Sequence, residues 1–258
     1  MLTPARGPAV EKVGGEGSLA YPYGMDDLVN TVEMYLKAVL ELEEENIVPL
    51  RARISERLEQ SGPTVSQTVA RMERDGLVVV STERHVELTP LGRQRAMSVM
   101  RKHRLAETFL SDVVGLDWEQ IHDEACRLEH VMSDRVENRL MELLKEPSRS
   151  PYGNPIPRPE EIREPDLPND IVNLMMLVAG RDVVHAKVRW IGEPLQVDHV
   201  LLKQLRQTGL LPGSSGAFTS HGPGVIARMD GSDQELELPH EFAAHIFVTE
   251  KSRRPLSV

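Results

Sequence analysis

Apolar residues recur at three- and four-residue steps along the first part of the chain, which is the period of an α-helix. The pattern opens at Asp26 and closes in the acidic run Glu41–Glu45, before Asn46 and Pro49. Its apolar positions are Leu28, Val29, Val32, Leu36, Val39 and Leu40. The sequence therefore predicts a first helix from Asp26 to the acidic run.

Two short helices and a hairpin are predicted next. Residues 50–58 have helical spacing, and a turn at 60–62 leads to a helix that begins at Pro63, because proline is tolerated in a first helical turn. This helix has an apolar stripe (Val65, Val69, Met72) and an opposite face of Thr64, Gln67, Thr68 and Arg71. The runs 77–80 and 85–88 flank a short turn, as in a β-hairpin. This order of elements predicts a winged helix-turn-helix.

The rest of the chain divides into a helical part and a strand-rich part. Helices are predicted at 90–114, 118–132 and 133–145, followed by a proline-rich linker at 147–168. Short strand-like runs at 183–190, 224–229, 235–238 and 244–248 then predict a small β-barrel. Residues 1–24 are rich in Gly, Pro and Ala and predict a disordered extension. The expected fold class is α+β with several domains.

Charge is distributed unevenly. The 258-residue chain has a net charge of -10, yet residues 51–104 contain eleven Lys and Arg residues against six Asp and Glu residues. A basic segment in an acidic protein is typical of a surface that meets phosphates. A single cysteine, Cys126, suits a reducing cytoplasm. The sequence has no apolar run long enough for a membrane span and no secretion signal, so we expect a cytoplasmic protein without a membrane partner.

Metal-binding side chains gather in two of the predicted helices. At 100° per residue, His122, Cys126, Glu129 and His130 share one helix face, and His103 and Glu107 lie at i and i+4 of the preceding helix. A lone His/Glu pair is usually a surface ion pair. Thiolate, imidazole and carboxylate groups together form a ligand set for a first-row transition metal. Six such candidates on adjacent helices therefore predict a metal site.

The motifs of several enzyme classes are missing. The sequence contains neither a His-Glu-x-x-His helix nor a Gly-x-Ser-x-Gly elbow, and Gly213–Gly216 does not join a strand to a helix as a phosphate loop would. Cys126 lies mid-helix among carboxylates, which we expect to raise its pKa rather than activate it as a nucleophile. We therefore expect no enzyme activity.

Three stretches of the chain, at residues 49–77, 100–107 and 122–132, carry a resemblance to a known family. There and across residues 25–157 the sequence resembles the diphtheria toxin repressors and iron-dependent regulators of actinobacteria. The resemblance implies a winged helix-turn-helix DNA-binding domain (25–96), a helical dimerisation and metal-binding domain with the proline-rich linker (97–165), and an SH3-like domain (166–258). It also implies a homodimer that binds palindromic operators and represses iron-uptake genes when Fe(II) is bound. The resemblance also implies that Co(II), Ni(II), Mn(II) or Zn(II) can substitute for Fe(II).

The resemblance also assigns residues to sites. It implies a primary metal site of Met34, Cys126, Glu129 and His130, and an ancillary site of His103, Glu107, His122, Glu193 and Gln196. From its pattern alone Met34 would be a core residue. For DNA, the resemblance places Ser61, Pro63 and Gln67 against bases and Arg51, Thr64, Ser66, Arg71, Arg74 and Arg84 near phosphates. Glutamine can bridge an adenine edge, and arginine and threonine can bind phosphates.

Three alternatives differ from an iron-dependent repressor. A manganese-sensing homologue is disfavoured by sulfur ligands, because Mn(II) prefers oxygen and nitrogen. A metalloenzyme would need an open coordination position and a nearby base that is not itself a ligand. A metal-storage or adaptor protein is disfavoured by the basic segment.

Overall fold

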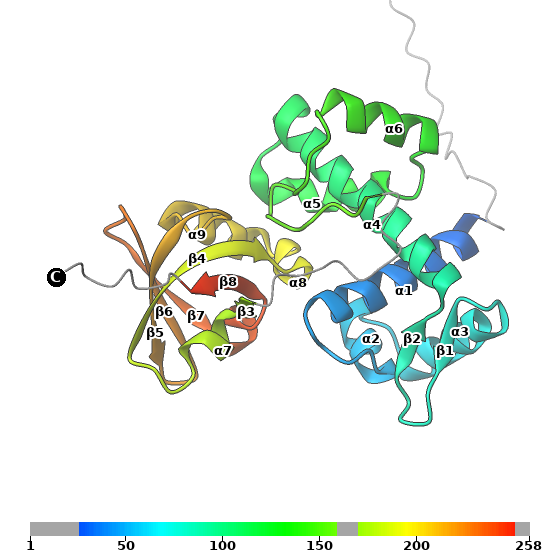
Figure 1. Cartoon of the computed structure of the whole chain (residues 1–258), viewed down its shortest axis with the longest axis horizontal. Helices are drawn as coiled ribbons and strands as arrows, with labels where there is room; N and C mark the ends of the chain where they lie inside the picture. The colour runs from blue at the N-terminus through cyan, green and yellow to red at the C-terminus, as the bar shows by residue number, and fades with distance from the viewer. Residues whose placement is uncertain (1–25, 159–169, 251–258) are drawn as a thin grey trace, which may run out of the picture.

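The architecture has three parts, seen in Figure 1 as a winged-helix unit, a helical unit and a curved sheet. The structure is a computed structural model that describes residues 26–158 and 170–250. The extension predicted at residues 1–24 lies outside the described residues.

The winged helix-turn-helix is present as predicted. It consists of α1 (Asp26–Glu44), α2 (Arg51–Leu58), α3 (Gly62–Arg74) and the antiparallel strands β1 (Val78–Val80) and β2 (Val86–Leu88). Ser61 caps α3, since its side chain accepts a hydrogen bond from the backbone N–H of Thr64. The predicted stripe of α3 is fully buried. Thr68, however, is also buried, so its assignment to the polar face was wrong.

The helical unit differs from the prediction at its second helix. It contains α4 (Pro90–Phe109), a π-helical turn (Leu110–Val114), a 3-10 turn (Trp118–Gln120), α5 (Ile121–Leu128) and α6 (Asp134–Leu143). The first predicted helix is confirmed: Thr89 caps it, and it ends at Gly115, which has a φ of 75°. By contrast α5 ends four residues earlier than predicted, so Glu129 and His130 lie in the turn that follows it.

The described part of the predicted linker is packed against its neighbours. The hydroxyl of Tyr152, a fully buried residue, donates a hydrogen bond to the carbonyl oxygen of Trp118 at 2.7 Å. The carbonyl oxygen of Tyr152 accepts one from the N–H of Ile191 at 2.9 Å. Residues 147–158 therefore join the helical unit to the sheet instead of only spanning the space between them.

The C-terminal part is an antiparallel sheet with strand order β3-β8-β4-β5-β6-β7. Its strands are β3 (Ile171–Asn173), β4 (Val183–Ile191), β5 (Ser215–His221), β6 (Gly224–Met229), β7 (Glu235–Pro239) and β8 (Ile246–Glu250). Four of them were predicted, and β3 and β5 were missed. The helices α7 (Leu174–Val178), α8 (Glu193–Gln196), α9 (His199–Thr208) and α10 (His240–Ala243) were also missed. Inward-facing residues of the sheet, among them Val184, Ala186 and Val188 on β4, build the core of this part.

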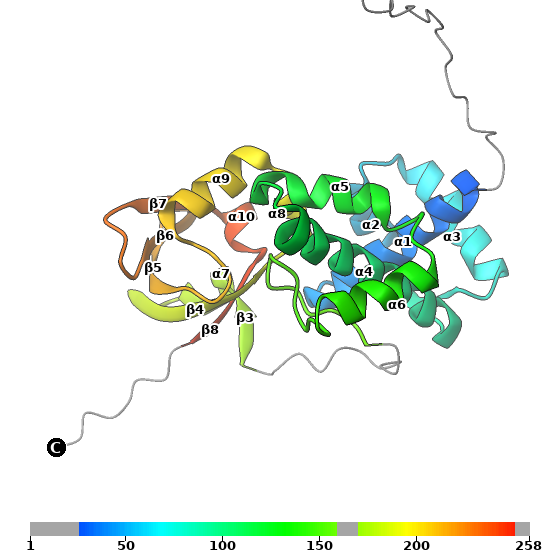
Figure 2. The same ribbon diagram turned by 90° about the horizontal axis from the view of Figure 1, so that it is seen from above.

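Helices α8 and α9 bring the sheet to the helical unit, as Figure 2 shows from above. His199 of α9 lies 3.0 Å from the carboxylate of Asp123, and Arg206 lies 3.2 Å from that of Glu119. The short helix α8 is thereby held beside α5.

Candidate metal centre and nucleic-acid interface

A cavity of about 800 Å³ lies where the three parts meet. Its walls come from α1, from α2, from α5 and the turn that follows it, and from α8, with His245 beside them. Apart from the charged residues of α2, its metal-binding and charged side chains include those of Met34, Lys37, Glu41, His122, Cys126, Glu129, His130 and Glu193. All four residues implied for the primary site therefore face one space.

His103, Glu107 and His122 form a buried triad. Nε2 of His103 lies 2.9 Å from Oε1 of Glu107, the i+4 contact expected within α4, and Nδ1 of His122 lies 3.5 Å from the same oxygen. The two imidazole rings are 4.9 Å apart, edge to face. Burial raises the pKa of Glu107, but the two histidines outweigh it and lower this pKa to about 2. The structure thus brings together three of the five residues that the resemblance implies for the ancillary site.

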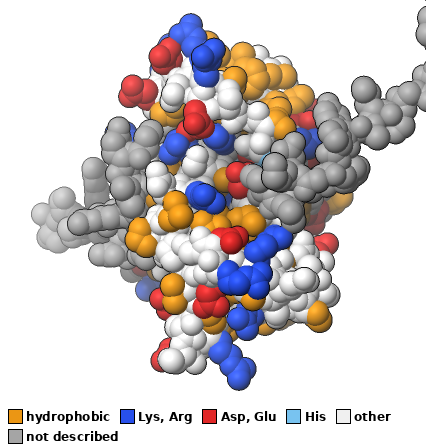
Figure 3. Space-filling model, turned by 90° about the vertical axis from the view of Figure 1, so that its right-hand side faces the viewer, with side chains coloured by type: hydrophobic (Ala, Val, Ile, Leu, Met, Phe, Trp, Pro, Cys, Tyr) orange, Lys and Arg blue, Asp and Glu red, His pale blue; other side chains and the backbone are white. Residues whose placement is uncertain are grey.

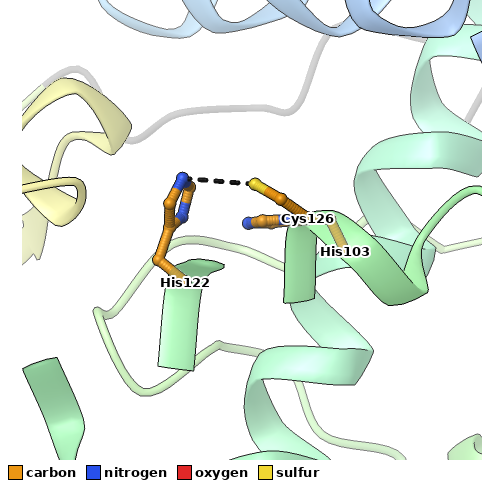
Figure 4. A group of neighbouring side chains, drawn as sticks. All are labelled: His103, His122 and Cys126. Carbon is orange, nitrogen blue, oxygen red and sulfur yellow. Dashed lines mark hydrogen bonds between the residues drawn. The ribbon is translucent and has the colours of Figure 1, made fainter. Parts of the chain in front are cut away.

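Cys126 lies beside the two histidines, as Figure 4 shows. Its Sγ atom is 3.4 Å from Nε2 of His122, and the donor atoms of His103, His122 and Cys126 all lie within 4.8 Å of one another. Burial raises the pKa of Cys126, but Lys37 and the two histidines lower it to about 6. The expected rise was wrong, because α5 turns the thiol toward cations and away from the carboxylates of its own helix. A thiolate at neutral pH is the form that binds a metal.

Glu129 and His130 complete this cluster from the turn after α5. Oε2 of Glu129 lies 3.0 Å from Nζ of Lys37 and 2.5 Å from Nδ1 of His103. Burial raises the pKa of Glu129, but Lys37 and His103 lower it to about 2. Nδ1 of His130 lies 2.7 Å from the carboxylate of Glu33, and this contact fixes the imidazole ring from outside the cluster.

Met34 lies on the wall of the cavity and not in the core. It is 38% exposed, whereas the next two residues of α1, Tyr35 and Leu36, are fully buried. The structure therefore contradicts the core interpretation of Met34, and its thioether faces the same space as Cys126.

Glu193 and Gln196 reach the junction from α8, and both are buried. The amide nitrogen of Gln196 donates hydrogen bonds to Oδ1 of Asn154 at 3.1 Å and to the carbonyl oxygen of Ile191 at 2.8 Å. Its Oε1 atom, like Oε2 of Glu107 and Oε2 of Glu193, is buried without a hydrogen-bond partner among the described residues. Buried acceptors without donors are costly. Carboxylate and amide oxygens are, like imidazole nitrogens, atoms that can bind a divalent metal ion.

Several charged residues at this junction were not identified from the sequence. Arg104 is fully buried, contacts Glu44 at 2.5 Å and Glu193 at 3.2 Å, and donates to the carbonyl oxygen of Pro155 at 2.6 Å. Glu41, Glu44 and Glu45 belong to the acidic run and are also buried. The sequence signal for them was the helical spacing itself, since Lys37, Glu41, Glu44 and Glu45 follow Met34 at steps that keep them on one side of α1.

The exposed surface at the start of α3 carries the residues assigned to DNA bases and two of those assigned to phosphates. Ser61, Pro63, Thr64, Ser66 and Gln67 are all exposed around its N-terminal half. Figure 3 views the molecule from the side of the winged-helix unit. Lys and Arg side chains gather in the lower half of this view, with acidic groups among them. This is the level at which α3 and the β1–β2 hairpin lie in Figure 1. Such a surface can meet a negatively charged groove.

The arginines assigned to phosphates do not form a uniform set. Arg74 and Arg84 are exposed, and Arg84 has a φ of 67° in the turn of the hairpin. Arg51 and Arg71 are only partly exposed, and the Nε atom of each is buried without a hydrogen-bond partner in the described ranges. Arg71 lines a groove with Asp75 and Arg95. Of these four arginines, Arg74 and Arg84 are therefore the more exposed and can reach a ligand.

No helix among residues 26–158 and 170–250 is long and apolar enough to cross a membrane.

Comparison with known protein families gives two matches. Residues 27–86 match the family described as "Iron dependent repressor, N-terminal DNA binding domain". Residues 89–158 match "Iron dependent repressor, metal binding and dimerisation domain".

Curated relatives cover most of the chain. It is 54% identical over 214 residues to the diphtheria toxin repressor of Corynebacterium glutamicum. This alignment covers 82% of this chain and 93% of that protein. It is 50% identical over 232 residues to the iron-dependent repressor IdeR of Mycobacterium tuberculosis, covering 88% of this chain and all of that protein.

Solved structures share the fold. The crystal structure of T. acidophilum IdeR matches with a TM-score of 0.68 and 29% identity, covering 85% of this chain and 97% of that one. A manganese-dependent transcriptional repressor in complex with manganese matches with a TM-score of 0.69 and 28% identity, covering 85% of this chain and all of that one.

Proposed function

The chain belongs to the iron-dependent repressor family of metal-dependent transcriptional repressors, which are not enzymes, and we propose that Fe(II) is the metal that activates it. In this proposal a cytoplasmic homodimer binds a palindromic operator and represses iron-uptake genes. The family descriptions support DNA binding, metal binding and dimerisation, and our proposal adds the ion, the operator symmetry and the regulated genes.

One observation carries the proposal. The cavity at the junction receives Met34 from α1, which belongs to the DNA-binding unit, and Cys126, Glu129 and His130 from the helical unit. Bonds from one ion to both sets of donors would fix α1 against the helical unit. The position of α3, the helix proposed to read DNA bases, would then depend on the metal.

The two sites use different donors. Met34, Cys126, Glu129 and His130 would hold the activating ion, with Glu33 orienting His130. His103, Glu107 and His122 would hold the second ion, with Glu193 and the free Oε1 of Gln196 completing it from the sheet domain. A bound divalent ion supplies several strong bonds between groups that are distant in sequence.

These positions explain how metal can control DNA binding. Two copies of α3 in a dimer read two half-sites only if their separation matches about one turn of DNA or a multiple of it. A metal that binds better to the form with this separation shifts the population toward it. Within each copy, Gln67, Ser61 and Pro63 would read bases, while Arg51, Thr64, Ser66, Arg71, Arg74 and Arg84 would contact phosphates.

The donor chemistry favours iron over manganese. Cys126 and Met34 are sulfur donors, and hard Mn(II) prefers oxygen and nitrogen. One solved neighbour is a manganese-dependent repressor, so Mn(II) is the second candidate on the same fold.

A DNA-binding titration under anaerobic conditions separates the two ions. The DNA is a duplex selected from random sequences by the protein in the presence of metal. We expect Fe(II) to activate binding at lower free concentration than Mn(II), and activation by Mn(II) alone would overturn the assignment of iron.

A further inference from the structure

Lys37 of α1 is a buried cation between two carboxylates that belong to the two proposed metal sites. Its Nζ atom lies 3.0 Å from Oε2 of Glu129 and 3.6 Å from Oε2 of Glu193, and only 8% of its side chain is exposed. Glu129 is a primary-site residue of the helical unit, whereas Glu193 is an ancillary-site residue from α8. One ammonium group therefore touches both donor sets and links all three parts of the chain.

Lys37 differs from Arg104, another buried cation of the junction. Arg104 bonds Glu44 and a backbone carbonyl as well as Glu193, so its guanidinium has partners that are not proposed ligands. The closest carboxylate to the Lys37 ammonium group is that of Glu129, and its second ion pair is with Glu193. The carboxylate oxygens of both residues are ones that a divalent ion would need as ligands.

A positive charge at this position has two opposite effects on the protein. It compensates buried carboxylates, which would otherwise be strongly destabilising. It also repels any divalent ion bound a few ångströms away, and this repulsion is large in a site that is shielded from water.

We propose that Lys37 is a built-in competitor for the metal: its ammonium group holds Glu129 and Glu193 until a divalent ion displaces it, and so sets the metal concentration at which the protein is activated. The inference rests on the proposed function, since it concerns the affinity of the same sites. Metal binding then replaces a single charge by a double charge at the junction. The competitor keeps the protein folded when metal is scarce and raises the concentration needed for activation.

The test is a Co(II) titration of the whole chain after treatment with a chelator, monitored by the thiolate–Co(II) absorption of Cys126 and by calorimetry. Lys37→Met removes the charge and keeps most of the volume. We expect it to bind Co(II) about tenfold more tightly or better, while the melting temperature of the chelator-treated protein falls. Lys37→Arg keeps the charge and should bind Co(II) with nearly the affinity of the parent. Lys187→Met removes an exposed lysine of β4 and should change neither quantity.

The outcomes are distinct. Equal or weaker Co(II) binding by a folded Lys37→Met variant overturns the inference, because a purely structural lysine would give no gain in affinity. The same gain in Lys37→Arg or Lys187→Met also overturns it, since the effect would not come from this charge. If Lys37→Met does not fold, the uncharged Lys37→Gln variant makes the same comparison. A parent protein that binds no Co(II) contradicts the proposed function itself, before any comparison of variants.

Discussion

The Sγ atom of Cys126 lies 3.4 Å from Nε2 of His122, so a donor of the proposed primary site is in contact with a donor of the ancillary site. Both atoms must be free of protons before they bind a metal. The protonation of this pair therefore controls how tightly metal is held.

Metal affinity is expected to rise with pH between about 6 and 9. Burial lowers the pKa of His122, but the hydrogen bonds that its protonated ring donates to Cys126 and Glu107 outweigh burial and raise this pKa to about 9. Below that value an incoming ion must displace a proton from His122, so affinity increases by up to about tenfold per pH unit for one proton. Co(II) titrations at pH 6.5, 7.5 and 8.5 check this, and an affinity independent of pH would contradict it.

Glu193→Ala combined with Gln196→Ala should weaken the ancillary site and leave the primary site mostly intact. These side chains contribute, from α8, two buried oxygens that accept no hydrogen bond from the described residues. Calorimetry should show the loss of one binding event per chain, while the Cys126 thiolate absorption with Co(II) persists. Unchanged stoichiometry and affinity would remove both residues from the set of ligands.

Gln67→Ala and Arg84→Ala should affect DNA binding in different ways. Removal of the Gln67 amide relaxes preference at one base pair, at a cost of about 1–3 kcal/mol. Removal of the Arg84 charge weakens binding to all sequences and flattens the dependence on salt. Titrations with selected and random duplexes at several salt concentrations distinguish these roles. If the two variants lose the same affinity on both duplexes, the assigned roles are wrong.

Arg104→Met should destabilise the chain strongly. It leaves the carboxylates of Glu44 and Glu193 in a buried junction without their guanidinium partner, and breaking a buried ion pair in this way costs about 3–5 kcal/mol. A denaturant titration measures the change in the free energy of unfolding. Arg139→Ala, which removes an exposed ion pair with Glu142, is the control and should cost less than about 1 kcal/mol. Equal stability of Arg104→Met and parent would contradict this account of the junction.

The sequence predicted the DNA-binding unit well because its elements are specified locally. The stripe of Val65, Val69 and Met72 and the cap at Ser61 each act within a few residues. In the sheet domain α9 was missed, although Asp198 caps it and Leu201, Leu202 and Leu205 are buried at helical spacing. The short apolar runs of this domain fit a strand as well as a helix. Only packing against the sheet decides which of the two forms.

The metal cluster was predicted in part for a similar reason. Spacing within a helix identified His122, Cys126 and the pair His103/Glu107, but it could not place Met34 or the residues of α8 near them. Their contacts depend on how the three parts of the chain pack. The low pKa of Cys126 was missed because it arises largely from Lys37 of α1 and His103 of α4, which spacing within its own helix could not place beside the thiol.

The most direct test of the account is a DNA-binding titration with the parent, Cys126→Ala and Met34→Ala, with Fe(II) and with a chelator under anaerobic conditions. The two substitutions remove sulfur donors from opposite sides of the junction, one in the helical unit and one in α1. Both variants should keep the parent's melting curve and dimer. We predict that Fe(II) increases the parent's affinity for its selected duplex by about tenfold or more, and that neither variant responds. A variant that responds to Fe(II) as the parent does, or a parent that binds equally well with chelator, would contradict the proposal that metal joins α1 to the helical unit.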